Sequence, residues 1–184
     1  MLRIIGGTAR GTRILTPDTD KTRPTLDRVK ESVFNILMPY ITDTVVLDLF
    51  SGSGNLGIEA LSRGASRAVF VDQSRKCINI INENLVKTKF TDKATVLNME
   101  VSRAIKYLAE KGEKFDIVFM DPPYNMNFLA KTIQLLDDFD IISEDGIVAC
   151  EHHEDEKAPE ESGRLKKVRT RTYGDTLFSF YERV

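Results

Sequence analysis

The sequence predicts an α/β protein with a mostly parallel sheet of seven strands, and three observations carry this prediction. Short apolar runs alternate with segments of helical periodicity through most of the chain. The apolar run at residues 45–50 closes in a glycine-rich turn, and residues 165–181 alternate around a second turn, as an antiparallel hairpin does. In a sheet of this kind, ligands bind at the carboxyl ends of the strands.

Composition fits one domain over residues 1–184, with residues 1–40 as a hairpin and helix extension and residues 41–184 as the core. Hydrophobic residues make up 41% and charged residues 29% of the 184 residues. We expect a cytoplasmic monomer that does not contact membranes, because no apolar run is long enough to span a bilayer and residues 1–6 do not resemble a secretion signal. Cys77 and Cys150 are expected to be reduced core residues.

The N-terminal extension concentrates positive charge, although the whole chain has a formal net charge of −2. Two short strands at residues 2–5 and 12–15 are expected to flank a glycine-rich turn, followed by an amphipathic helix at residues 26–37 with Thr25 as its cap. Within residues 1–30, basic side chains outnumber acidic ones. We expect an RNA phosphate-binding face on this extension, formed by Arg10, Arg13, Arg23 and Arg28.

Residues 45–63 are expected to form a strand, a glycine turn and a helix, the core of a nucleotide-type binding site. Gly52, Gly54 and Gly57 match the dinucleotide fingerprint, and Asp72 lies where a ribose-binding acid is expected, so a nicotinamide dehydrogenase remains an alternative. Asp48 distinguishes a dinucleotide site from a site for another kind of nucleoside ligand. A carboxylate inside this strand would repel a pyrophosphate, whereas it suits a ligand with an amine and a sulfonium charge, such as S-adenosylmethionine. The alternative for Asp48 is a buried structural acid.

Later segments continue the alternation, with strands expected at residues 68–72, 94–98, 115–120 and 146–150. The acids of residues 151–161 are expected to lie in a solvated loop without a functional role. His152 and His153 have no partners at ligand spacing, so we expect a polar loop there and no metal. A hairpin at residues 165–181 should end the sheet.

The strand at residues 115–120 leads directly into Asp121-Pro122-Pro123-Tyr124, whose chemistry suits an amine acceptor. An exocyclic amine is a poor nucleophile because its lone pair is delocalised into the ring. Asp121 and the backbone carbonyl of Pro122 can accept both N–H groups and draw the nitrogen toward a tetrahedral state. Tyr124 offers a ring face on which an extruded base can stack. The alternative is an ordinary loop at the end of a strand.

These features together resemble the class I S-adenosylmethionine-dependent methyltransferases, which have a Rossmann-like fold. Residues 3–7 and 23–25, with the helix that follows, more narrowly resemble the RsmD-type small-subunit ribosomal RNA guanine-N2 methyltransferases. The resemblance implies methyl transfer to the N2 amine of a guanine in 16S ribosomal RNA, either free or in the assembling small subunit. It implies catalytic roles for Asp121, Pro122 and Tyr124, and cofactor contacts from Asp48, Phe50, Gly52, Gly54, Asp72, Gln73, Met99, Glu100 and Thr25.

Two alternatives remain open at this point. The Asp-Pro-Pro-Tyr motif is shared with enzymes that methylate adenine N6 or cytosine N4, so another RNA or DNA could be the substrate. Enzymes that act on DNA or on other RNA would normally carry a separate recognition domain, for which 184 residues leave no room. A nucleotide-binding module without catalysis would be expected to lack Asp121 and Tyr124.

Overall fold

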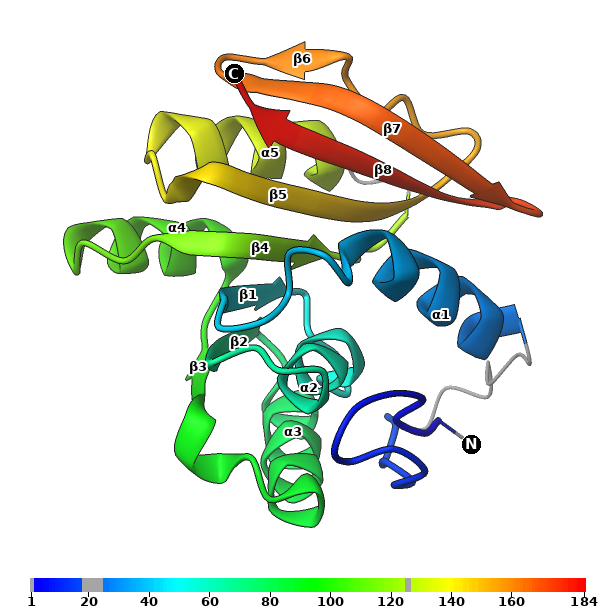
Figure 1. Cartoon of the computed structure of the whole chain (residues 1–184). Helices are drawn as coiled ribbons and strands as arrows, with labels where there is room; N and C mark the ends of the chain where they lie inside the picture. Colours follow the sequence, from blue (N-terminus) through cyan, green and yellow to red (C-terminus); the bar gives the residue numbers. More distant parts are fainter. Residues whose placement is uncertain (1, 18–24, 125–126) are drawn as a thin grey trace.

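The computed structural model describes residues 2–17, 25–124 and 127–184, which build one eight-stranded sheet covered by helices on both faces (Figure 1). The strand order is β3-β2-β1-β4-β5-β8-β7-β6. The strands from β3 to β5 are parallel, and β8, β7 and β6 continue the sheet in antiparallel pairs. The predicted fold class is therefore confirmed. The elements are α1 (Thr25–Leu37), β1 (Val45–Leu49), α2 (Asn55–Ser62), β2 (Arg67–Asp72), α3 (Arg75–Thr88), η1 (Thr91–Lys93), β3 (Ala94–Asn98), α4 (Val101–Glu110), β4 (Phe115–Met120), α5 (Phe128–Asp138), β5 (Ile142–His153), β6 (Glu161–Ser162), β7 (Leu165–Tyr173) and β8 (Thr176–Arg183).

The sheet differs from the prediction at its C-terminal side. It has eight strands because the short strand β6 adds to the edge of β7. Strand β5 is also longer than residues 146–150, because β8 pairs with it from Ile147 opposite Glu182 to His153 opposite Thr176. The prediction of a loop beginning at Glu151 was therefore wrong, since residues 151–153 belong to the sheet.

The N-terminal extension forms a turn held by one isolated bridge, between Arg3 and Arg13, where two strands were expected. The Ile4 N–H donates to the Thr12 carbonyl at 3.0 Å. The next two N–H groups, of Ile5 and Gly6, donate instead to the carboxylate of Glu59 on α2. Regular pairing stops because these donors are diverted to that side chain.

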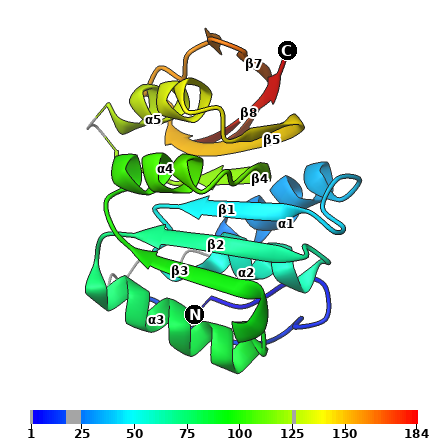
Figure 2. The same ribbon diagram turned by 90° about the vertical axis from the view of Figure 1, so that its left-hand side faces the viewer.

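Two apolar clusters lie on opposite faces of the sheet, as the turned view in Figure 2 helps to follow. Helices α1, α2 and α3 cover one face, with buried Phe34, Ile58 and Ile81. Helices α4 and α5 cover the other, with Ile105 and Ile133. Among the described residues the longest helix, α3, has 14 residues, which is too short to cross a bilayer.

Candidate active site

Two neighbouring cavities open at the carboxyl ends of the central parallel strands, where this topology places ligand sites. One cavity, of about 220 Å³, is lined by Asp72, Gln73, Glu100 and other residues. The second, of about 190 Å³, lies under α1 and is lined by Asp48 and the glycine turn. Phe50 and Asp121 line both cavities, so the two spaces meet at these side chains.

Asp48 is a buried carboxyl with one oxygen available to a ligand. It is 3% exposed, and its Oδ2 accepts the Gly57 N–H at 2.9 Å, the one hydrogen bond to this side chain within the described part of the chain. Burial is the main cause that raises the pKa of Asp48 to about 8, and the charges of Asp121 and Asp72 add to it. A cationic group in the cavity would offset this cost of burying the charge.

The glycine turn brings the start of α2 close to this carboxyl. A Cβ on Gly57 would lie 2.4 Å from the ring of Phe70, so only glycine lets the helix approach the sheet here. Gly52 and Gly54 have positive φ angles of 56° and 77°, and no heavy atom lies within 4 Å of a Cβ built on Gly52. The backbone at Gly52 therefore borders open space, as expected of a turn that a ligand approaches.

Asp72 ends β2 beside the other cavity, as predicted. Its oxygens accept the N–H groups of Gly52 at 2.9 Å and Ser74 at 2.8 Å, which fixes the carboxylate while each oxygen keeps a lone pair for a hydroxyl donor. Asn98, which the sequence analysis did not single out, donates to the carbonyls of Asp72 and Gln73 at 3.1 and 3.0 Å. It holds this loop in place from the neighbouring strand.

Of the two cofactor contacts expected after β3, Met99 and Glu100, the structure brings only Glu100 to the cavity. Glu100 lines it and caps α4, accepting the Arg103 N–H at 3.2 Å. Met99 packs against the apolar cluster under α4, and Val101 lines the cavity in its place. Phe128 also lines the cavity, with its ring centroid 5.9 Å from that of Phe50. The cavity therefore combines aromatic and aliphatic side chains with the acids Asp72 and Glu100.

The Asp-Pro-Pro-Tyr segment follows β4 and reaches the junction of the cavities. Asp121 is exposed to solvent at the mouth of the cavities, and desolvation by the protein atoms packed around its carboxyl raises its pKa. Pro122 is buried, whereas the Tyr124 side chain is 43% exposed. The Tyr124 ring meets the His153 ring edge-on at 5.9 Å between centroids.

Glu151 is a site residue that the sequence analysis missed, because the acids after Cys150 were assigned to a solvated loop. It lines the same cavity as Asp48 and Asp121. The Tyr124 hydroxyl lies near its carboxyl, and burial together with the Asp121 charge raises its pKa. The sequence did contain a signal for this position. Side chains alternate between the two faces of a strand, so if the strand continues past Cys150, Glu151 points to the face opposite Cys150.

A buried ion-pair network lies behind the Asp48 cavity and was also missed. Glu59 is fully buried, with Oε2 at 3.0 Å from Lys30 Nζ and Oε1 at 2.8 Å from Arg63 Nε. Lys30 Nζ also donates to Asn55 Oδ1 at 2.8 Å and to the Arg3 carbonyl at 2.6 Å. A glutamate inside an otherwise apolar helix segment, with a lysine on the apolar stripe of α1, indicates such a pair.

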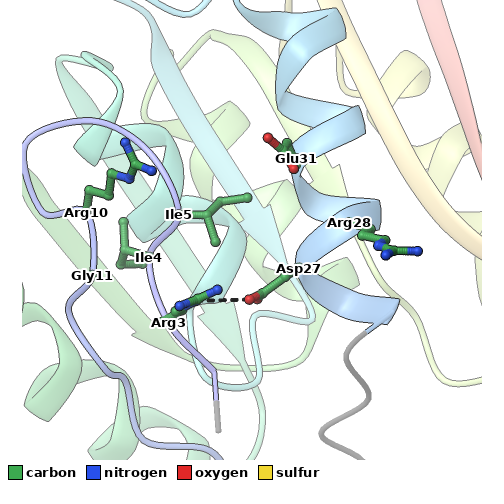
Figure 3. Close-up of a pocket in the computed structure, with 8 residues that line it drawn as sticks. All are labelled: Arg3, Ile4, Ile5, Arg10, Gly11, Asp27, Arg28 and Glu31. Atoms are coloured by element: carbon green, nitrogen blue, oxygen red, sulfur yellow. Dashed lines mark hydrogen bonds and ion pairs between the residues drawn. The ribbon is translucent and has the colours of Figure 1, made fainter.

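The four candidate RNA-binding arginines are not all brought together. Arg10 and Arg28 line a cavity of about 450 Å³ between the N-terminal turn and α1 (Figure 3). Arg3, also at this cavity, points toward Asp27 and pairs with it at 3.0 Å. Arg13 is exposed and does not line the cavity. Arg23 lies outside the described residues, and α1 begins at Thr25, whose side chain is also outside them.

The arrangement suits one ligand that spans both cavities and a second that approaches Asp121. Asp48 offers an acceptor for an amine at one end, and Asp72 offers an acceptor for hydroxyl groups at the other. Asp121 stands between them, where a reacting group would be held. This geometry fits group transfer from a nucleoside with a cationic tail.

Comparisons with known proteins agree with this geometry. The family model described as "Conserved hypothetical protein 95" matches residues 2–182. "Ribosomal RNA small subunit methyltransferase D" of Escherichia coli (strain K12) is 37% identical over 99% of this chain and 90% of its own length. The solved structure of a hypothetical protein from Thermus thermophilus has a TM-score of 0.85 and 28% identity, covering both chains completely.

A more distant likeness concerns the fold alone. The structure of a "SAM Dependent Methyltransferase" from Agrobacterium tumefaciens has a TM-score of 0.69 and 17% identity, covering 93% of this chain and 66% of that one. The fold is thus that of class I methyltransferases. Together with the full-length match above, it follows that the chain belongs to the family of ribosomal RNA small subunit methyltransferase D.

Proposed function

We propose that this protein transfers a methyl group from S-adenosylmethionine to the exocyclic N2 amine of a guanine in small-subunit ribosomal RNA. One observation carries the proposal. Asp121, the first acceptor of the Asp-Pro-Pro-Tyr segment, lines both the Asp48 cavity and the Asp72 cavity. The name of the Escherichia coli relative supports ribosomal RNA as the substrate.

The residues present fit this cofactor. Asp48 is buried and has one hydrogen-bond donor among the described residues, so its other oxygen suits the cofactor's amino group. Asp72 would accept the ribose hydroxyls, with Gln73 and Glu100 beside it and Phe50 and Phe128 on the apolar walls. When bound, S-adenosylmethionine supplies an electrophilic methyl group on a sulfonium centre.

The chain's own part in the reaction is to hold the amine. The Asp121 carboxylate and the Pro122 carbonyl accept its two N–H groups, which directs the nitrogen lone pair at the methyl carbon. The nitrogen gains positive charge as its new bond to carbon forms, and a fixed carboxylate stabilises that charge. The surplus proton leaves after transfer. Tyr124, on the exposed side, would stack against the extruded base.

The N-terminal extension would hold the RNA backbone. Arg10, on the turn, and Arg28, on α1, both line the cavity, and in the view of Figure 3 the Arg28 side chain extends from the helix away from the turn. Guanidinium groups bind phosphates through paired hydrogen bonds. Val29, next to Arg28 on α1, lines the Asp48 cavity, so a strand of RNA bound here would pass close to the site of transfer.

The test is mass spectrometry of small-subunit RNA from cells that lack the gene, before and after treatment with the purified protein and S-adenosylmethionine. Naked RNA and assembled particles are treated in parallel. We expect one nucleotide to gain N2-methylguanosine in at least one of these substrates, and the Asp121→Ala protein to add far less. Formation of N6-methyladenosine, or methylation only of added DNA, would contradict the proposed substrate.

A further inference from the structure

Glu151 stands beside Asp121 in the cavity that also holds Asp48. Cys150 on β5 pairs with Met120, the last residue of β4, so the next residues, Glu151 and Asp121, follow side by side at the edge of the sheet. Both lie on the face opposite the buried Met120 and Cys150 side chains, toward α1. Both line the same cavity, together with Phe178 of β8.

The carboxylate of Glu151 lies beside the acceptor segment and lines the cavity. The Tyr124 hydroxyl lies near both the Glu151 carboxylate and the Thr176 side chain. The two oxygens of the Glu151 carboxylate carry several lone pairs, so this side chain can accept from Tyr124 and from a ligand at the same time. Lys30, the cation that lines this cavity, is bound to Glu59 instead. The carboxylate of Glu151 is therefore directed to the cavity and available to donors that enter it.

Guanine and adenine differ next to their amines. In guanine, the N2 amine is followed by N1–H, so the edge presents a continuous row of donors. In adenine, the amine is followed by the unprotonated N1, an acceptor. In their ionised forms, two adjacent carboxylates match the first pattern and repel the second. Enzymes that act on extruded bases read this edge by hydrogen bonds.

We propose that Glu151 accepts the N1–H of the target guanine while Asp121 holds its N2 amine, and that this contact excludes bases with an unprotonated ring nitrogen at that position. The inference rests on the proposed function. The competing explanation is that Glu151 only holds Tyr124 in place through its hydroxyl. The two explanations differ in which substitution changes base selectivity.

The test compares guanosine with 2-aminopurine, which keeps the C2 amine but has an unprotonated N1. Once the methylated nucleotide is mapped, either base is placed there by ligation, and the RNA is assembled into particles if naked RNA is not a substrate. Single-turnover transfer is measured for the wild type, Glu151→Gln, Tyr124→Phe and, as a matched control, Glu154→Gln, which changes an exposed acid outside the cavity. Calorimetry with S-adenosylhomocysteine checks that each variant is folded.

We expect the wild type and Glu154→Gln to prefer guanosine on the order of 100-fold, because the analogue places an acceptor against a carboxylate. Glu151→Gln should reduce the preference below about tenfold, since its amide can donate to the unprotonated nitrogen. Tyr124→Phe should keep the preference. An unchanged ratio in Glu151→Gln, or an equal loss in Tyr124→Phe, would overturn the inference. If Glu151→Gln does not fold, Glu151→Ala is scored by the same ratio. No transfer to guanosine by the wild type would instead contradict the proposed function.

Discussion

Replacing Asp48 with asparagine should stabilise the free protein, although it removes a proposed cofactor contact. Burial raises the pKa of Asp48 to about 8 from the ordinary aspartate value of 3.8. Between these values the folded state binds more protons than the unfolded state, so this group makes folding less favourable as pH rises. The asparagine oxygen can still accept the Gly57 N–H, and its amide does not titrate.

The magnitude follows from the pKa difference. Each unit corresponds to about 1.4 kcal/mol, so at pH 7, roughly three units above the unfolded value, Asp48→Asn should raise the free energy of unfolding by on the order of 4 kcal/mol. The gain should vanish near pH 4, grow by about 1.4 kcal/mol per pH unit, and level off above pH 8. Contributions of groups that do not interact with Asp48 cancel in the difference between the two proteins, whereas Asp121 and Asp72, whose charges add to its pKa shift, leave a smaller contribution.

The assay is urea unfolding of the wild type and the variant at half-unit steps from pH 4 to pH 9. Asp43→Asn, at an exposed position before the same strand, controls for the loss of one negative charge and should change stability by less than about 0.5 kcal/mol. A difference between wild type and Asp48→Asn that does not depend on pH would refute the reasoning. It would mean that Asp48 is ionised in the folded protein.

Three further predictions concern ligands and catalysis. Asp72→Ala should weaken S-adenosylhomocysteine binding by roughly 1.5 to 3 kcal/mol in calorimetry, the range for a hydrogen bond to a charged group, without creating affinity for NADH. Asp121→Ala should slow single-turnover transfer by on the order of 100 to 1,000-fold, whereas Asp121→Asn, whose amide oxygen still accepts, should keep more activity. Charge reversal at Arg10 should raise the Michaelis constant for RNA and flatten its salt dependence, and reversal at Arg13, outside the cavity, should do so less.

Each of these predictions has an outcome that would contradict it. If Asp72→Ala binds S-adenosylhomocysteine as tightly as the wild type, the proposed contact between Asp72 and the ribose is wrong. Equal inactivity of both Asp121 variants, with cofactor binding intact, would replace the orienting role by proton acceptance or by a need for the negative charge. Equal effects at Arg10 and Arg13 would indicate a diffuse electrostatic field rather than a contact at the cavity of Figure 3.

The sequence alone predicted the fold and the candidate acids Asp48, Asp72 and Asp121, because each of them is marked by residues that lie close to it in the chain. Asp48 and the glycine turn share one strand and its exit, and Asp121 directly follows an apolar run. Glu151 and Lys30 were missed because their roles depend on pairing across the chain. Glu151 joins the site only because β8 extends β5, and Lys30 is buried only because Glu59 meets it from α2.

The contacts of Glu59 also determine when the N-terminal turn can form during synthesis. Its carboxylate receives the N–H groups of Ile5 and Gly6, more than fifty positions earlier in the chain. The turn leaves the ribosome first and can contact α1 next, through Asp27 and Lys30, yet the N–H groups of Ile5 and Gly6 have no acceptor until α2 has emerged as well. The segment that carries Arg10 is therefore completed after the glycine turn, and it cannot be grafted onto another methyltransferase unless Glu59 and Lys30 are transferred with it.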